Sequence, residues 1–372
     1  MDFSFSDDEQ AVADLAKQIL GDLASHEHVR KVEKAGGARF DRGLWKAMAE
    51  AGLSGIAVPE SCGGAGLGFL ELALIAEQIG RRAAPVPFIE CAVLAGLPLA
   101  EFGSEDQKQR WLPGLAAGEA VLTAALVEDS GDAGAVATTA TQQDDGYRLD
   151  GRKICVPFGQ LADCVLVPAV EAGGELGVFL VDPASEGCEL TELDTTSGQP
   201  EAILTLAGVR VAAADRLPGA GKEIVEWIAD RANAALCWLA LGACEEALAL
   251  TAEYSKTRKQ FDMPIAQFQA VGHRQADAYI DTEAIRLTAW QAASRIADGL
   301  PASTEVALAK FWAAEGGARV VHAAQHLHGG VGVDRDYPLH RYFLYAKQLE
   351  LTLGGSTQQL LKIGQHLAEL PA

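Results

Sequence analysis

Tyr254-Ser255-Lys256-Thr257-Arg258-Lys259-Gln260-Phe261 and, further along the chain, His328-Gly329-Gly330-Val331-Gly332-Val333 are the stretches that decide the fold. Phe268-Gln269-Ala270 follows the first of them. Helical periodicity begins after Gly219-Ala220-Gly221 and continues through both stretches almost to the end of the chain. Because the helical segments are long enough for a four-helix bundle, we predict a C-terminal four-helix bundle domain over residues 219–372.

The first part of the chain is predicted to form an N-terminal α-helical domain over residues 1–118. Asp41 is expected to cap a helix over 44–48, and Gly52 to end it. Gly63-Gly64-Ala65-Gly66-Leu67-Gly68 is predicted to be a tight interhelical turn rather than a phosphate-binding loop, because no strand of a βαβ unit precedes it. Apolar residues recur at helical spacing in two segments: Val12, Leu15, Ala16, Ile19 and Leu20, and then Leu72, Ile75, Ala76 and Ile79.

The middle of the chain, residues 119–218, changes to short apolar runs separated by Gly, Asp and Pro. Such punctuation is typical of strands, so we predict a compact antiparallel β-barrel domain between the two helical ones. The fold class expected for the whole chain is therefore α+β. The predicted strands are Val121–Leu126, Tyr147–Leu149, Cys164–Val167 and Gly177–Val181.

Charge and cysteine content restrict the partners and the compartment. The net charge of −21 makes the long-range field repulsive to nucleic acid and to anionic membranes. The longest uncharged apolar run, Ala234–Cys244, is far shorter than the roughly 20 residues of a membrane span. The seven cysteines are odd in number and form no CxxC pair, and the chain starts with acidic residues, so we expect reduced thiols and a cytoplasmic protein.

The two stretches quoted first, in this order, resemble the C-terminal half of the acyl-CoA dehydrogenase flavoproteins. Further matches extend the resemblance over essentially the whole chain: Phe40-Asp41, Leu44-Trp45, Gly52–Glu60, Gly63–Gly66 and Phe102–Pro113. The resemblance implies that the protein binds FAD and acts on an acyl-CoA thioester. In that chemistry a carboxylate removes the α-proton while the β-hydrogen leaves as hydride to the flavin.

The carboxylate is missing where the resemblance places it. Leu353-Gly354-Gly355-Ser356-Thr357-Gln358-Gln359 aligns with a family segment that usually reads Tyr-Glu-Gly-Thr, and Gly355 stands at the position of the Glu. Some family members carry the base on the first helix of the C-terminal domain, which corresponds here to Ala232, with Asn233 beside it. Asp230 is left as an alternative base close by. Glu350 is expected to face solvent or a partner chain.

The pocket that holds the flavin ring in relatives is also altered. Cys155 stands for a Trp that packs on the flavin, so a large aromatic contact is lost. Pro157 stands for a Thr that points its hydroxyl at the ring edge, so the hydroxyl and the backbone N–H are both lost. The preceding loop, Val127–Gly134, keeps Glu128 but departs from the usual pattern.

A different set of cofactor-binding residues is retained. Arg258 keeps the family spacing together with Phe261 and Gln269, and the resemblance implies that this Arg reaches the pyrophosphate of an FAD bound by the neighbouring subunit. Gly329 and Gly330 are expected to bring backbone close to the same FAD. Three further residues complete the predicted set: His326 in place of a Gln, and Thr357 and Gln359, which in relatives serve the subunit's own flavin.

The chain therefore most resembles the base-less subunit of heterotetrameric (α2β2) acyl-CoA dehydrogenases, including those linked to steroid side-chain β-oxidation. The implied partners are a paralogous catalytic subunit, an acyl-CoA substrate and an electron-transfer flavoprotein or similar acceptor. Two alternatives stay open: a self-sufficient homomeric dehydrogenase that uses Asp230, and a non-catalytic module that binds an acyl thioester or acts as a scaffold. No metal site is expected, because the spacing of His322, His326 and His328 does not place all three on one helical face.

Overall fold

The computed structural model describes residues 5–131 and 133–368. The chain divides into two compact units. The first combines Met1–Arg30, Ala73–Ala84 and Asn233–Ala372, and the second combines Lys31–Leu72 with Pro85–Ala232. The secondary structure changes from helix to strand and back to helix along the chain, which confirms the predicted fold class. The predicted domain boundaries remain a prediction.

The N-terminal helices begin and end at the expected signals. Asp41 caps α3 by accepting a hydrogen bond from the Leu44 N–H at 3.0 Å, and Gly52 follows the end of that helix with φ of 78°. Gly64 lies in a tight turn, where a Cβ would meet the Val58 carbonyl oxygen at 2.1 Å, as predicted for an interhelical connection. The helices are α1 (Asp7–Leu23), α2 (His26–Lys34), α3 (Arg42–Glu50), α4 (Phe69–Arg82), α5 (Leu97–Phe102) and α6 (Glu105–Ala116), with a π-helical segment at Ile89–Gly96.

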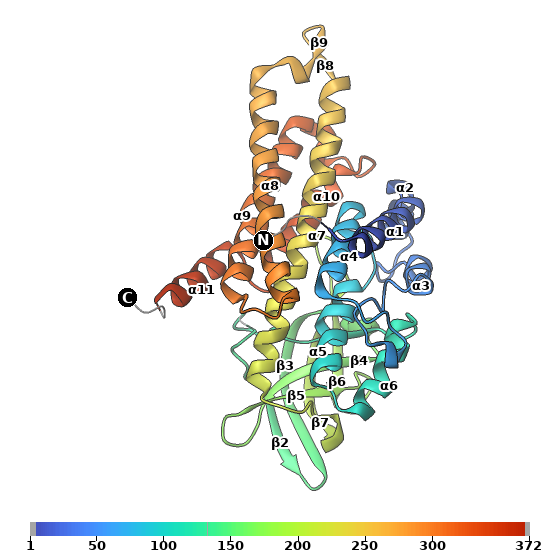
Figure 1. Cartoon of the computed structure of the whole chain (residues 1–372), viewed down its shortest axis with the longest axis vertical. Coiled ribbons are helices and arrows are strands. Elements are labelled where there is room, and N and C mark those ends of the chain that lie inside the picture. The colour runs from blue at the N-terminus through green and yellow to red at the C-terminus, as the bar shows by residue number, and fades with distance from the viewer. Residues whose placement is uncertain (1–4, 132, 369–372) are drawn as a thin grey trace. The chain divides into compact units, whose positions relative to one another are not determined.

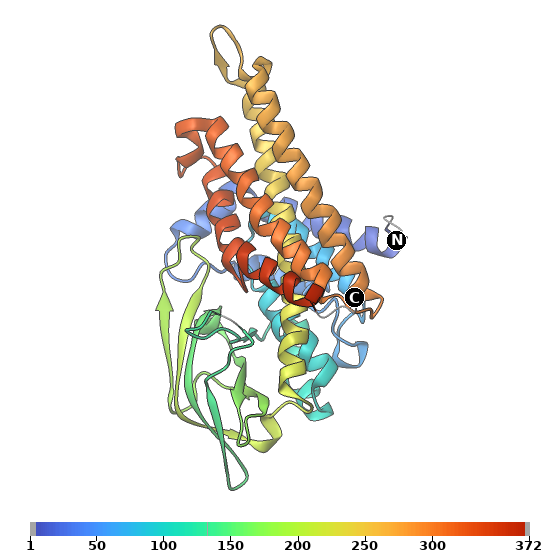
Figure 2. The ribbon, with the colours of Figure 1, turned by 90° about the vertical axis from the view of Figure 1, so that its left-hand side faces the viewer.

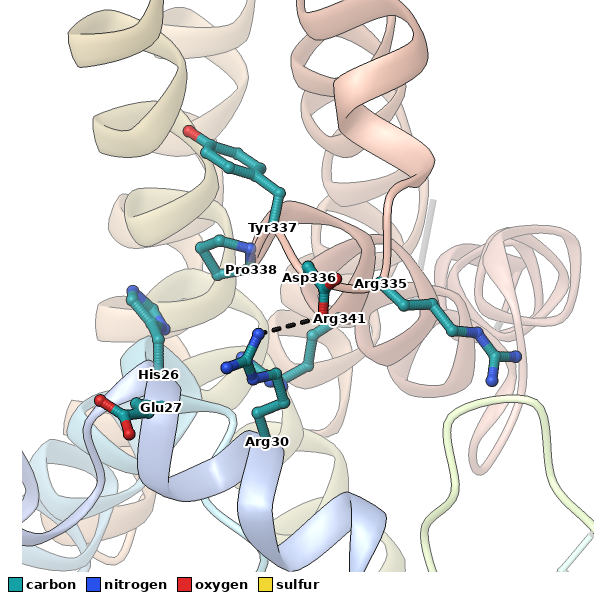
Figure 3. A pocket seen from close by; sticks show the side chains of 8 residues that line it. All are labelled: His26, Glu27, Arg30, Arg335, Asp336, Tyr337, Pro338 and Arg341. Atoms are coloured by element: carbon teal, nitrogen blue, oxygen red, sulfur yellow. Dashed lines mark hydrogen bonds and ion pairs between the residues drawn. The ribbon is translucent and has the colours of Figure 1, made fainter.

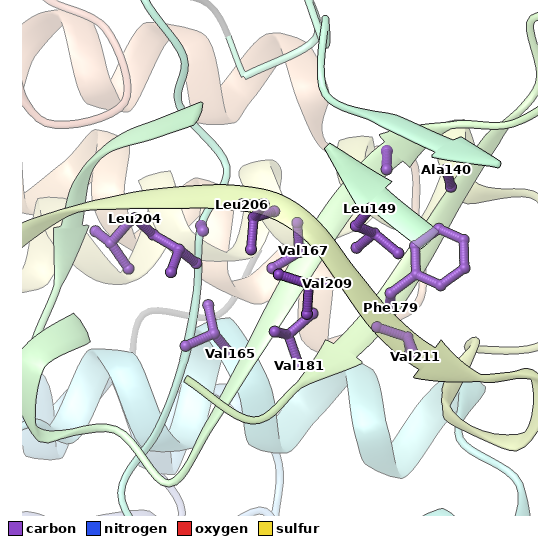
Figure 4. Packing of buried hydrophobic residues seen from close by; sticks show 13 residues of the cluster. Ala140, Leu149, Val165, Val167, Phe179, Val181, Leu204, Leu206, Val209 and Val211 are labelled. Atoms are coloured by element: carbon purple, nitrogen blue, oxygen red, sulfur yellow. The ribbon is translucent and has the colours of Figure 1, made fainter. Parts of the chain in front are cut away.

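The middle of the chain forms a seven-stranded sheet in the second unit. Its strands are β1 (Leu122–Ala124), β2 (Thr139–Gln143), β3 (Gly146–Pro157), β4 (Cys164–Val170), β5 (Leu176–Val181), β6 (Cys188–Leu193) and β7 (Glu201–Ala212). Leu149, Val167, Phe179 and Leu204 belong to the buried apolar cluster on one face (Figure 4). Burial of these side chains against each other is the main stabilising contribution to this part of the fold.

The sheet differs from the strictly antiparallel arrangement that we expected. β1 pairs with β4 in parallel, and Thr139 of β2 pairs with Val170 of β4 in parallel as well, whereas the other pairings are antiparallel. Parallel neighbours need a long connection, and the chain between β1 and β4 contains the whole β2–β3 hairpin. Short apolar runs alone cannot reveal such a crossover.

Long helices follow the sheet: α7 (Gly221–Thr257), α8 (Gln269–Ala297), α9 (Ser303–His328), α10 (Leu339–Leu351) and α11 (Ser356–Ala368). In the first unit α9 packs against α8, α10 and α11 (Figures 1 and 2). Small residues bring α7 close to α4, because a Cβ on Gly80 would meet the Leu239 carbonyl oxygen at 2.1 Å. The predicted bundle is confirmed, and α11 packs against it.

Helix α7 is long and apolar enough to cross a membrane when length and composition alone are considered. In the structure 72% of its most apolar window is buried. Such burial is typical of the central helix of a globular domain, whose apolar side chains pack against neighbouring elements.

Candidate functional site

The hairpin between α7 and α8 carries the first group of predicted site residues. Strands β8 (Lys259–Gln260) and β9 (Met263–Pro264) leave a two-residue turn in which Phe261 and Asp262 have φ of 53° and 63°. A bulky side chain rarely adopts a positive φ, and residues held in this way are concentrated at functional sites. Phe261 is 86% exposed, and its ring meets that of Phe268 edge-on at 6.2 Å between centroids.

Arg258 lies exposed at the base of this hairpin. Its backbone is fixed, because its N–H donates to the Tyr254 carbonyl at 2.8 Å and its carbonyl accepts from the Ile265 N–H at 2.9 Å. Its side chain makes no ion pair or hydrogen bond within residues 5–131 and 133–368. Gln269 is exposed at the start of α8 and pairs with His273 at 3.4 Å. The hairpin thus presents a guanidinium group on a held backbone.

The turn between α9 and α10 carries the second group. Gly329 has φ of 59° and ψ of −136°, a combination that is open only to glycine. A Cβ at Gly329 or Gly330 would have no atom within 4 Å, so the backbone here is open to a close approach. Gly332 instead packs on the Gln325 backbone, where a Cβ would meet the carbonyl oxygen at 3.0 Å. His326 lies exposed on the last turn of α9.

The structure brings these two groups together. Tyr254, one turn before Arg258, stacks on His328, the residue before Gly329, with 4.3 Å between ring centroids and 24° between the planes. The Tyr254 hydroxyl donates to the His328 carbonyl at 3.4 Å. Arg258 and the glycine turn are therefore neighbours in one unit, as a shared ligand requires.

The predicted base position lies in the loop between α10 and α11, and this loop is closed by amides. The Gly355 N–H donates to the Gln358 side-chain oxygen at 3.0 Å. The Gln359 amide is 1% exposed and donates to the carbonyls of Leu353 and Gly354, at 3.4 and 3.1 Å. Thr357 is exposed, whereas Gln359 is committed to its own loop. The predicted contacts of both with a flavin stay predictions.

Neighbouring carboxylates do not replace the missing base in this loop. Glu350 is half-buried and pairs with Lys347 on the same helix. A Cβ added to Gly355 would have the Glu350 carbonyl oxygen as its nearest contact, at 3.6 Å. The space for a side chain is therefore present, while the carboxylate is not.

A buried lysine that the sequence analysis missed fixes the start of this loop. The Lys310 ammonium donates to the carbonyls of Leu349 and Glu350 at 2.8 and 3.2 Å, and the residue is fully buried. Burial lowers its pKa from 10.5 to about 8. Its positive charge lies at the C-terminal end of α10, where the helix dipole favours a cation. An isolated Lys among Ala309, Ala313 and Ala314 was the available signal.

The alternative position for a base, on α7, has no carboxylate at its centre. Ala232 is fully buried, as expected from the alignment. Arg231 lies over the Trp227 ring at 3.5 Å, and burial lowers the pKa of its guanidinium to about 10. Asp230 beside it is half-buried. The negative charge of Asp230 favours the charged guanidinium and so opposes the lowering of the Arg231 pKa.

The segment predicted to hold the flavin ring lies near the negative charge of Glu201. Cys155 is exposed, with φ of 48°, at an irregularity in the pairing of β3 with β7. Burial of its thiol and the nearby negative charge of Glu201 raise its pKa. Burial, and to a smaller extent Glu201, also raise the pKa of Glu90 on the π-helical segment to about 7. A reduced flavin ring is electron-rich and is stabilised by hydrogen-bond donors, so this segment does not fit the ring.

The one retained residue of the flavin loop has a structural role. Glu128 is 5% exposed and forms an ion pair with fully buried Lys153 at 2.7 Å. It also accepts from the Ala137 N–H and from the N–H and hydroxyl of Thr138. Burial opposes ionisation, but these donors outweigh it and lower the pKa of Glu128. The pair fastens the loop to β3, and Asp132 of the same loop lies outside the described residues.

The three histidines of α9 do not converge. His322 packs edge-on against Phe343 at 4.9 Å and His326 is exposed, whereas His328 is buried. Within the described parts of the chain no group of three His, Cys, Asp or Glu residues is placed to hold a metal ion.

A charged pocket of about 260 Å³ lies beside the glycine turn (Figure 3). Arg30 of α2 forms an ion pair with Asp336 at 3.0 Å across it. Arg335 points away from this pair, and so does Tyr337 in another direction (Figure 3). Because both partners of the ion pair are substantially exposed, the pair contributes little to stability.

Comparisons with known proteins agree with this architecture. Residues 6–119 match the model of the acyl-CoA dehydrogenase N-terminal domain, and residues 219–368 match that of the C-terminal domain. The acyl-CoA dehydrogenase FadE27 of Mycobacterium tuberculosis is 43% identical, with all of both chains covered. A chain of the ChsE4-ChsE5 complex from Mycobacterium tuberculosis superimposes with a TM-score of 0.95 at 44% identity, with all of both chains covered.

A second solved structure is similar to the same extent. It is a variant of the Tcur3481-Tcur3483 steroid ACAD, with a TM-score of 0.90 and 42% identity over 97% of this chain and 98% of that one. Both solved neighbours are therefore chains of two-component assemblies.

Proposed function

The chain belongs to the acyl-CoA dehydrogenase family, and on that premise we propose that it is the subunit without a catalytic base in a heteromeric enzyme. Enzymes of this family are FAD-dependent oxidoreductases. When bound, FAD accepts the β-hydrogen of the acyl-CoA as hydride. In the proposed complex a catalytic paralogue supplies the carboxylate that removes the α-proton and holds the flavin ring. This chain contributes Arg258 and the turn Gly329–Val333.

The closed loop at Gly355 is the observation that carries this proposal. The loop contains no carboxylate, and the side chains of Gln358 and Gln359 occupy its polar backbone groups. A general base must lie within hydrogen-bond reach of the proton that it abstracts. Since the loop offers amides and hydroxyls but no carboxylate, proton removal falls to the partner.

The outward-facing residues support a role in binding FAD across an interface. Arg258 has an exposed guanidinium group on a fixed backbone, and such a fork binds pyrophosphate oxygens bidentately. Gly329 and Gly330 leave room for the backbone to approach a ligand. Phe261 is held exposed in a strained conformation, which a contact with the partner would use.

The substrate class and the other partners are also part of the proposal. Similarity to the ChsE4-ChsE5 complex and to a steroid ACAD favours an α2β2 assembly that acts on a bulky, steroid-like CoA thioester. An electron-transfer flavoprotein or similar acceptor would reoxidise the flavin, and the complex would work in the cytoplasm.

Flavin content tests the proposal. The full chain should be purified alone and after co-expression with the catalytic paralogue, and FAD should be measured by absorbance after denaturation. We expect a colourless chain alone and about one FAD per pair of unlike subunits in the complex. Stoichiometric FAD in the chain alone would instead support the homomeric alternative with Asp230 as base. A chain that never acquires FAD, even with the paralogue, would support a non-catalytic binding module.

A further inference from the structure

Three aromatic side chains meet where the hairpin-bearing helix and the glycine turn come together. Tyr254 lies on the last turn of α7, His328 ends α9, and Tyr337 lies just before α10. The three rings form a triangle, with the imidazole 4.3 Å from the Tyr254 ring and 5.2 Å from the Tyr337 ring, and 6.3 Å between the two tyrosine rings. His328 is 3% exposed, so it is held inside the bundle.

Hydrogen bonds give the His328 ring one orientation and one tautomer. Nδ1 lies 2.8 Å from the Ala324 carbonyl oxygen, which can only accept, so Nδ1 carries the proton. In the neutral ring Nε2 then accepts from the Tyr337 hydroxyl at 3.2 Å. Burial lowers the pKa of His328, which favours the neutral form that this arrangement needs.

The same stack links the two segments that are proposed to reach FAD. The Tyr254 carbonyl accepts from the Arg258 N–H at 2.8 Å. The Tyr254 hydroxyl donates to the carbonyl of His328, the residue before Gly329. Tyr337 bonds the imidazole through its hydroxyl, and its ring also meets that of Tyr254 at 6.3 Å between centroids. Its side chain is directed away from the Arg30–Asp336 pair (Figure 3). A shift of the imidazole would therefore change the position of Arg258 relative to the turn.

We propose that His328 is a positioning residue: through its stack with Tyr254 and its bond to Tyr337 it sets the spacing between Arg258 and the Gly329–Val333 turn. The effect of His328 on FAD rests on the proposed function, whereas its effect on the spacing does not. The role is indirect, because His328 is buried behind the groups that face outward.

Hydrogen exchange on the full chain tests the spacing without any ligand. His328→Ala should speed amide exchange about 10-fold or more at residues 258–262 and 329–333. Tyr337→Phe removes a single hydroxyl and should give a smaller change in the same segments, which keeps the test available if His328→Ala folds poorly. The matched control is His322→Ala on the same helix, where exchange in both segments should stay unchanged. Unchanged exchange in both the His328 and Tyr337 variants would overturn the proposal.

Flavin retention in the co-expressed complex tests the consequence. Tyr337→Phe should weaken FAD retention about 3- to 10-fold, as measured by ultrafiltration. The turnover rate per bound flavin, measured at saturating FAD, should stay unchanged. In an Arg258→Ala background the same substitution should have little further effect, because the two residues act through one contact. Additive losses would show that His328 and Tyr337 do not act through Arg258. If Arg258→Ala alone leaves FAD retention unchanged, the proposed function fails. The hydrogen-exchange measurement then still tests whether His328 sets the spacing between Arg258 and the Gly329–Val333 turn.

Discussion

Replacing Arg258 with alanine should release FAD from the complex without unfolding this chain. The side chain is exposed and makes no ion pair or hydrogen bond with the rest of the described chain, so its loss should change the free energy of unfolding by less than about 0.5 kcal/mol. A hydrogen bond between charged groups contributes about 1.5–3 kcal/mol. Because 1.4 kcal/mol corresponds to a factor of ten, the Kd for FAD should rise about 10- to 100-fold.

The measurement is FAD release from the co-expressed complex, followed by flavin fluorescence during dilution, with subunit assembly checked by light scattering. Lys259→Ala is the matched control, because Lys259 is the adjacent exposed cation on the same hairpin. Arg258→Lys should recover only part of the affinity, since an ammonium group cannot bind two oxygens through a planar fork. The reasoning is refuted if Arg258→Ala binds FAD as the wild type does, or if the Lys259 variant loses FAD equally.

Three further predictions follow from the bundle. Gly355→Glu should fold normally, because the nearest atom to its Cβ is 3.6 Å away. The isolated variant should nevertheless show no substrate-dependent reduction of flavin or dye. Any turnover would contradict the proposal that this chain does not hold the flavin ring itself. Gly329→Ala should lower the free energy of unfolding by about 1–3 kcal/mol in denaturant titrations. Gly330→Ala should leave that free energy unchanged but weaken FAD retention by the complex, measured by ultrafiltration. The free energy of unfolding of the wild type, measured relative to that of Lys310→Met, should rise by up to roughly 3 kcal/mol between pH 8 and 10.5. It should rise because the unfolded chain keeps the lysine proton in that range, whereas the folded chain has lost it. A difference in urea midpoints that does not change with pH would contradict this.

Local signals predicted the helices well because each signal acts within a few residues. The side chain of Asp41 bonds the amide three residues on, and Gly52 ends the same helix with a positive φ, so both ends of α3 follow from the sequence. Strand β7 was missed although its buried residues Ala202, Leu204 and Leu206 alternate with less buried ones. Strand β6 is half polar, with Glu189, Thr191 and Glu192 among its six residues, so its own pattern does not predict the hairpin that it forms with β7.

The candidate site was predictable where a residue acts by facing outward and unpredictable where it acts through a buried contact. Arg258 and Gly329 were identified by their spacing, and the structure leaves both accessible. The contacts among Tyr254, His328 and Tyr337 bring together residues from α7, α9 and the loop before α10, which spacing along one chain cannot show. The closure of the Gly355 loop by Gln358 likewise depends on side-chain geometry that no motif encodes.

We expect that a carboxylate restored at position 355 would not by itself make this chain an active enzyme. Proton removal, hydride acceptance and flavin binding need groups in separate places, and we propose that this chain keeps only groups of the last set. The resemblance implies that Cys155 and Pro157 cost the ring segment an aromatic contact and two hydrogen-bond donors, and the negative charge of Glu201 lies near the Cys155 thiol. We expect a glutamate at position 355 to restore only the carboxylate, and not the ring contacts that the resemblance assigns to positions 155 and 157. The outward hairpin and turn need no such pocket, because in the proposed complex they act on the FAD that the partner holds.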